Sequence, residues 1–99
     1  MTDLEKDVEL YLRRKVESLG GLCLKWVSPG NSGVPDRLIL MPGGRIWFVE
    51  LKRPDGGTVG RLQAYWRDLL HAWGFNTRII STKQQVDELL LEIRPGAVS

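Results

Sequence analysis

The chain has 99 residues, of which 42% are hydrophobic and 26% are charged, and its formal net charge is +2. This length supports one hydrophobic core, so we expect a single domain over residues 1–99. The sequence has neither an apolar run near the ~20 residues of a membrane span nor a signal-peptide pattern. The lone cysteine, Cys23, excludes an internal disulfide and a multi-cysteine zinc site, and it favours a reducing cytoplasm. We expect this to be the cytoplasm of a bacterium or of a phage-infected host cell.

Apolar spacing and turn residues predict seven elements along the chain. A first helix begins near residue 3 and ends at Gly20-Gly21, strands follow over 22–28, 36–41 and 45–52, and then come a helix over 61–73, a strand over 75–81 and a last helix. Two capping boxes mark helix starts: Thr2 with Glu5, and Thr82 with Gln85. The order α-β-β-β-α-β-α predicts an α/β fold, with a mixed sheet flanked by helices.

The turn Pro42-Gly43-Gly44 joins two of these strands in a hairpin, and the hairpin register places two carboxylates together. If Met41 faces Arg45 across the turn, Asp36 lies directly opposite Glu50. Side chains alternate between the faces of a strand, so Lys52 shares the face of the two carboxylates. The rest of both faces is apolar, which predicts central strands that are covered on both sides.

Two directly opposed carboxylates, with β-carbons roughly 5 Å apart, repel each other unless a cation lies between them. A hard divalent cation such as Mg²⁺ prefers oxygen ligands of this kind. Lys52 could then hold an attacking water or a phosphate. The alternative on spacing alone is a surface ion cluster in which Lys52 neutralises one carboxylate.

The segment before the first carboxylate carries a family resemblance. GVPDRLIL, a hairpin and then FVELK resemble the pattern of PD-(D/E)xK nucleases, with Pro35-Asp36 as the first half and Glu50-Leu51-Lys52 as the second. The chain is most similar to the VRR-NUC (virus-type replication-repair nuclease) branch, over a stretch from about Glu5 to Ser81. This resemblance implies a restriction-endonuclease-like α-β-β-β-α-β core with an additional C-terminal helix, and a metal-dependent deoxyribonuclease activity.

The resemblance also implies roles for individual residues. Asp36, Glu50 and the backbone carbonyl of Leu51 would bind Mg²⁺, for which Mn²⁺ would substitute, and Lys52 would orient the nucleophile. Glu5, from the first helix, would complete or support the site as a catalytic residue or outer metal ligand.

Two outer positions have alternatives. Glu5 falls inside the apolar arc of the first helix, whereas Glu9 lies just past its edge, so either could be the helical carboxylate of the site. The alternative for Glu5 is a helix-capping role. Gln63 would point toward the attacking water or the scissile phosphate, and its alternative is a solvated glutamine.

DNA binding needs cations that contact phosphates without reading sequence. The candidates are Lys25, which could instead lie at a sheet edge, and three arginines, Arg37, Arg53 and Arg61, with Arg45, Arg67 and Arg78 as further possibilities. Because small stand-alone relatives resemble junction-resolving enzymes, we expect a homodimeric, structure-selective endonuclease of the Holliday-junction resolvase kind. Alternatives are a flap, nick or restriction-type nuclease of the same fold, and a non-catalytic DNA-binding module.

Overall fold

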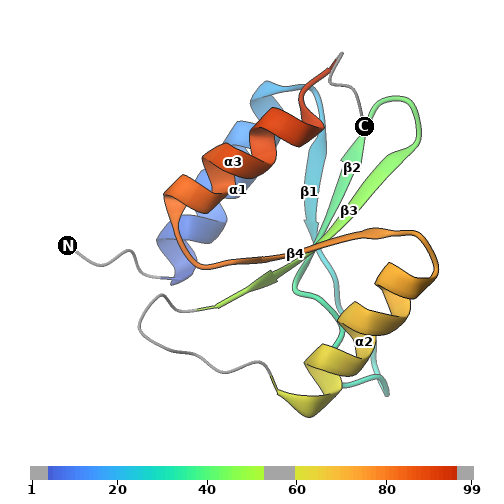
Figure 1. The fold of residues 1–99 in the computed structure, drawn as a ribbon. Helices are drawn as coiled ribbons and strands as arrows, with labels where there is room; N and C mark the ends of the chain where they lie inside the picture. The colour runs from blue at the N-terminus through green and yellow to red at the C-terminus, as the bar shows by residue number, and fades with distance from the viewer. Residues whose placement is uncertain (1–4, 53–59, 96–99) are drawn as a thin grey trace.

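The computed structural model describes residues 5–52 and 60–95 of the chain. Three helices and four strands follow one another in the predicted order (Figure 1). They are α1 (Glu5–Ser18), β1 (Leu22–Lys25), β2 (Arg37–Met41), β3 (Arg45–Leu51), α2 (Arg61–Ala72), β4 (Asn76–Ile80) and α3 (Lys83–Ile93). The predicted fold class is therefore confirmed.

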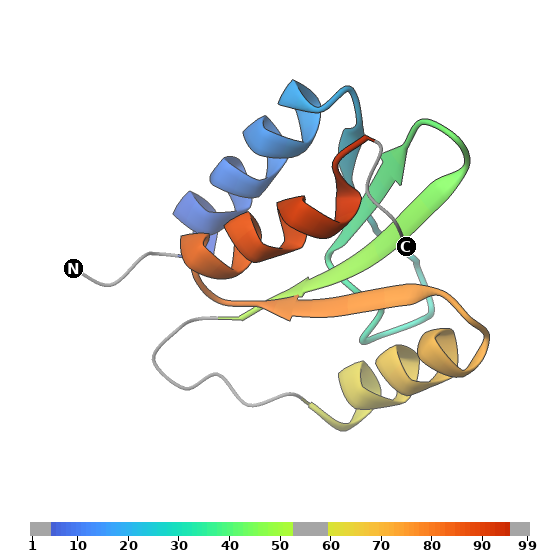
Figure 2. The same cartoon turned by 45° about the horizontal axis from the view of Figure 1, so that its top comes forward.

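The four strands form one mixed sheet in the order β1-β2-β3-β4. The first two pairings are antiparallel, and β3 pairs with β4 in parallel. Helices α1 and α3 pack together on one face of the sheet, and α2 lies on the other face (Figure 2). In this arrangement the C-terminal ends of β3 and β4 and the start of β2 lie at one end of the sheet, where all three helices begin.

The hairpin has the predicted register, because Met41 pairs with Arg45 and Arg37 pairs with Val49. Gly43 and Gly44 have φ angles of +91° and +75°, which residues with a β-carbon rarely adopt, so the turn needs its two glycines. Extending the register by one residue sets Asp36 opposite Glu50.

The main core lies between the sheet and the pair α1–α3. It contains one alternating set of strand side chains together with the inner faces of both helices: Cys23, Ile39, Met41, Trp47, Val49, Leu51 and Ile80 from the strands, and Val8, Leu12, Val16, Val86, Leu89 and Ile93 from the helices. Burial raises the pKa of the Cys23 thiol to about 11, which agrees with the inert buried thiol that its apolar neighbours predict.

The strand order confirms that the two hairpin strands are central, but their second face is covered only in part, since Leu38, Leu40 and Ile46 are half-buried there. Phe48 is buried there against the rings of Trp26 and Phe75, with centroids 5.2 and 5.4 Å away. Leu22 and Leu24 of β1, however, are 53% and 43% exposed. The reason is that α2 packs mainly along β4 and leaves the face of β1 open.

Several predicted boundaries shift by a few residues. β1 ends at Lys25 rather than at 28, β2 begins after Asp36, and β4 and α2 are each shorter than predicted. The capping box of Thr82 with Gln85 is confirmed, whereas Thr2 and Arg53 lie outside the described residues. Within the described ranges, no helix is long and apolar enough to cross a membrane.

Candidate active site

Asp36 and Glu50 meet at the end of the sheet where α2 begins. The backbone N–H of Leu51 donates a hydrogen bond to Asp36 Oδ2 at 2.8 Å, which fixes that carboxylate beside β3. Glu50 is only 7% exposed. Its burial, together with a hydrogen bond to the Asp36 carboxyl and the negative charge there, raises the pKa of Glu50 to about 8. At neutral pH the metal-free pair therefore holds one proton and carries a single negative charge.

Lys52 and Gln63 complete a hydrogen-bonded cluster with Glu50. The Gln63 amide donates to Glu50 Oε1 at 2.9 Å and its oxygen accepts from Lys52 Nζ at 2.5 Å. The same oxygen accepts from the backbone N–H of Gly60 at 2.9 Å, so Gln63 also caps the start of α2. The structure thus brings together four of the predicted site residues. Their catalytic roles remain predictions.

The backbone C=O of Leu51 points to the same side of β3 as its N–H, toward Asp36. The paired residues of β2 and β3 end at Arg37 and Val49, so Leu51 lies just beyond the ladder, beside Asp36. Pro35 is buried, and it lines a small hollow together with Glu50 and Gln63.

This set of oxygen donors fits a hard divalent cation. Two carboxylates in contact, one of them buried with a raised pKa, and the neighbouring backbone carbonyl of Leu51 are oxygen donors of the kind that Mg²⁺ or Mn²⁺ coordinates in proteins. Over residues 5–52 and 60–95, no group of three or more acidic, histidine or cysteine side chains is placed to hold a metal ion.

Of the two helical glutamates, only Glu9 lies where the sequence placed it, at the edge of the buried stripe of α1. Glu5 is exposed, so the prediction that it turns inward is wrong: the buried stripe of α1 begins at Val8, one turn later. Glu5 is still near enough to contribute to the raised pKa of Glu50. Glu9, at the edge of the stripe, is half-buried and its carboxylate lies 2.8 Å from Arg37 Nη2.

Arg37 is consequently not a candidate for phosphate contact, contrary to the sequence prediction. Its side chain is 11% exposed, pairs with Glu9 and donates to the Cys23 carbonyl at 3.3 Å. Because Arg37 alternates with Leu38 along β2, it faces α1 rather than the carboxylates. Of the other predicted DNA contacts, Lys25 and Arg61 are exposed near the site end of the sheet.

Replacing Arg37 by alanine is expected to lower the free energy of unfolding by about 3 kcal/mol, because it leaves the half-buried Glu9 carboxylate without its partner. Urea denaturation measures this change. Arg78→Ala removes a more exposed pair with Glu92 and should cost less than about 1 kcal/mol. Equal losses in the two variants would contradict a structural role for Arg37.

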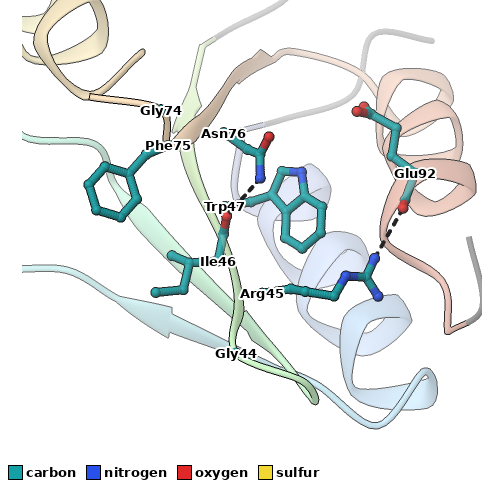
Figure 3. Close-up of a pocket in the computed structure, with 8 residues that line it drawn as sticks. All are labelled: Gly44, Arg45, Ile46, Trp47, Gly74, Phe75, Asn76 and Glu92. Carbon is teal, nitrogen blue, oxygen red and sulfur yellow. Dashed lines mark hydrogen bonds between the residues drawn. The ribbon is translucent and has the colours of Figure 1, made fainter. Parts of the chain in front are cut away.

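A larger hollow of about 450 Å³ lies at the opposite end of the sheet, at the starts of β3 and β4 (Figure 3). There, Arg45 Nη2 donates to the carbonyls of Glu92 and Ile93, at 3.2 and 3.1 Å, and ties the hairpin to the last turn of α3. The guanidinium also lies 5.0 Å from the ring centroid of Trp47. Arg45 therefore serves the fold rather than DNA binding, and this hollow lacks the paired carboxylates of the site.

Comparison with known proteins places this geometry in a family. The chain is similar to a solved VRR-NUC domain, at 35% identity over 87% of this chain and 92% of that chain, with a TM-score of 0.82. It is also 50% identical over 50 residues to p44, a protein named as a nuclease, from Acyrthosiphon pisum secondary endosymbiont phage 1. That match covers 50% of this chain and 54% of the phage protein, about half of its length, and no family model matches the chain. The identity and the shared fold across nearly the whole domain show that the chain belongs to the VRR-NUC family.

Proposed function

We propose that this protein is a Mg²⁺-dependent endonuclease that hydrolyses phosphodiester bonds in DNA. The observation that carries the proposal is the contact between Asp36 and the buried Glu50, on a fold shared with VRR-NUC domains. Two acidic groups held together in this way are unfavourable without a cation, and phosphodiester hydrolysis uses such a cation. The phage origin of the relative p44 is compatible with action in the cytoplasm of a host cell.

Each residue of the cluster has a defined part in the proposed reaction. Asp36, Glu50 and the Leu51 carbonyl would hold Mg²⁺ or Mn²⁺, which when bound stabilises negative charge on the phosphate and lowers the pKa of a coordinated water. Lys52 would donate a hydrogen bond to the attacking water. Gln63 would keep the ammonium group and Glu50 in place, as it does in the structure.

The bond changes are those of hydrolysis. The water oxygen forms a bond to phosphorus, the bond from phosphorus to one ester oxygen breaks, and the leaving sugar oxygen takes up a proton. The products are a phosphomonoester end and a hydroxyl end. Plasmid nicking by the purified protein, with Mg²⁺ titrated from zero and EDTA as the control, tests this proposal. Calorimetry that detects no binding of Mg²⁺ or Mn²⁺ would favour a non-catalytic DNA-binding module instead.

We further propose that the protein acts as a homodimer on four-way junctions. Support comes from apolar side chains left exposed on the α2 side of the sheet: Leu22 and Leu24 on β1, Phe75 just before β4, and Leu62, Tyr65 and Trp73 on or just after α2. A second copy would cover such a surface, and a two-fold axis would present two active sites to the two strands that must be cut.

Leu24→Glu is therefore expected to convert the dimer to a monomer and to abolish paired nicking of a four-way junction, because it places charge in the apolar surface. Sedimentation and a gel assay with junction, flap and linear duplex substrates measure both effects. Leu91→Glu, on the exposed side of α3 and 61% exposed in the wild type, is the matched control. A monomeric wild type would exclude the homodimer, and preferential cutting of flaps or duplex would point to another nuclease type.

A further inference from the structure

The loop between β1 and β2 is fastened directly to α2. The indole N–H of Trp66 donates to the backbone carbonyl of Ser32 at 3.1 Å. Gly33 has φ of +88°, and a β-carbon added there would lie 2.6 Å from the Leu62 β-carbon and 3.0 Å from the Gln63 nitrogen. The loop backbone therefore touches the first turn of α2 at a distance that no residue other than glycine permits.

Both of the fastened segments carry residues of the candidate active site. The loop leads through Pro35 into Asp36, and a hydrogen bond of 2.9 Å from the Trp26 N–H to the Asp36 carbonyl closes its base. The first turn of α2 carries Gln63, whose side chain reaches Glu50 and Lys52. The contact between the loop and α2 thus joins the two halves of the site independently of β3.

We propose that Trp66 and Gly33 are positioning residues, which set Gln63 against Glu50 and Lys52 by holding the first turn of α2 on the loop that carries Asp36. The proposal rests on the proposed nuclease function. Gln63 makes hydrogen bonds of 2.5 to 2.9 Å to three groups, and a displacement of about 1 Å would break them. Misplacement on that scale lowers catalytic rates by up to about 10²-fold.

A pair of glycine variants isolates the contact. Gly30 lies in the same loop with a similar φ of +82°, and a β-carbon there would meet nothing within 4 Å among the described residues. Gly33→Ala and Gly30→Ala therefore impose the same backbone strain, but only Gly33→Ala pushes the loop away from α2. We expect kcat to fall by about 10- to 100-fold in Gly33→Ala and by less than about 2-fold relative to wild type in Gly30→Ala.

A second pair avoids backbone strain altogether. Trp66→Phe keeps an aromatic ring but removes the N–H that binds the Ser32 carbonyl, and it should lower kcat by about 5- to 10-fold. Tyr11→Phe is the control, since it likewise removes one side-chain hydrogen bond, from the Tyr11 hydroxyl to Asp87, between α1 and α3 on the opposite face of the sheet. This pair still decides the question if Gly33→Ala fails to fold.

The closing experiment combines a double-mutant cycle with NMR. In a Gln63→Ala background, Trp66→Phe should cause little further loss of kcat, because its effect passes through Gln63. The side-chain amide signal of Gln63 should move in Trp66→Phe and stay in place in Tyr11→Phe. An unmoved signal, or additive losses in the cycle, would overturn the positioning role. Absence of cleavage by the wild type would refute the nuclease proposal, while the NMR comparison would still judge the positioning role.

Discussion

Lys52→Ala is expected to lower the rate of DNA cleavage by about 10²- to 10³-fold, the range typical of losing one charged donor at a developing transition-state charge. The Lys52 ammonium group lies 2.5 Å from Gln63 Oε1, beside the two carboxylates, and it lowers the raised pKa of Glu50. The alanine side chain has no group that could donate a hydrogen bond to the attacking water. Single-turnover kinetics on nicked or branched DNA at saturating Mg²⁺ measure this loss.

The fold and the metal site should both survive the substitution. Lys52 follows the last residue of β3 and is half-buried, so its removal costs little core packing. Removing a positive charge near Asp36 and Glu50 should also leave Mn²⁺ affinity equal or higher by calorimetry. Lys15→Ala, on the exposed side of the last turn of α1, is the control for charge alone. Undiminished cleavage by Lys52→Ala would contradict the proposed mechanism.

The centre of the candidate site was predictable because it depends on local rules. A three-residue turn with two glycines fixes the hairpin register, and strand alternation then decides which side chains share a face. From these two rules, the meeting of Asp36 with Glu50 and the separation of Glu50 from the core face follow directly. For Gln63, the family resemblance implied the direction toward the site, and in the structure its amide contacts Glu50.

The outer residues were not predictable because they depend on how elements pack. Helical periodicity gives an arc but not the point along α1 at which the sheet begins to cover it, so Glu5 was placed inward although it is exposed. For the same reason Arg37 was assigned to DNA, whereas α1 supplies it with a carboxylate partner in Glu9. The contact of Gly33 with α2 joins segments about 30 residues apart, and no local pattern encodes it.

Glu50→Gln is expected to stabilise the metal-free protein at alkaline pH while abolishing cleavage. In the folded protein, burial and the Asp36 carboxyl raise the pKa of Glu50 to about 8, from an unfolded value near 4.5. Between these pH values the folded chain holds a proton that the unfolded chain has released, so wild-type stability falls as pH rises through this window. The glutamine side chain does not titrate, so the stability of the variant does not fall in this way as pH rises.

At pH 8.5 the free energy of unfolding of metal-free Glu50→Gln should therefore exceed that of the metal-free wild type by roughly 1 to 3 kcal/mol. This difference should vanish near pH 4. Urea denaturation across this range measures it, with the exposed Glu88→Gln as the control. Mg²⁺ or Mn²⁺ should raise the melting temperature of wild type and not that of Glu50→Gln.

Metal binding to the wild type should also release close to one proton at pH 7, because the ion takes the place of the proton on Glu50. The buffer dependence of the calorimetric enthalpy gives this number. If Glu50→Gln lost stability at pH 8.5, or if wild type bound Mn²⁺ without releasing a proton, the carboxylate pair would not be the metal site. If both results held and DNA were still not cut, the pair would bind a cation without catalysing hydrolysis. Lys52 and Gln63 would then be the residues to examine, since they form the hydrogen-bonded cluster with Glu50.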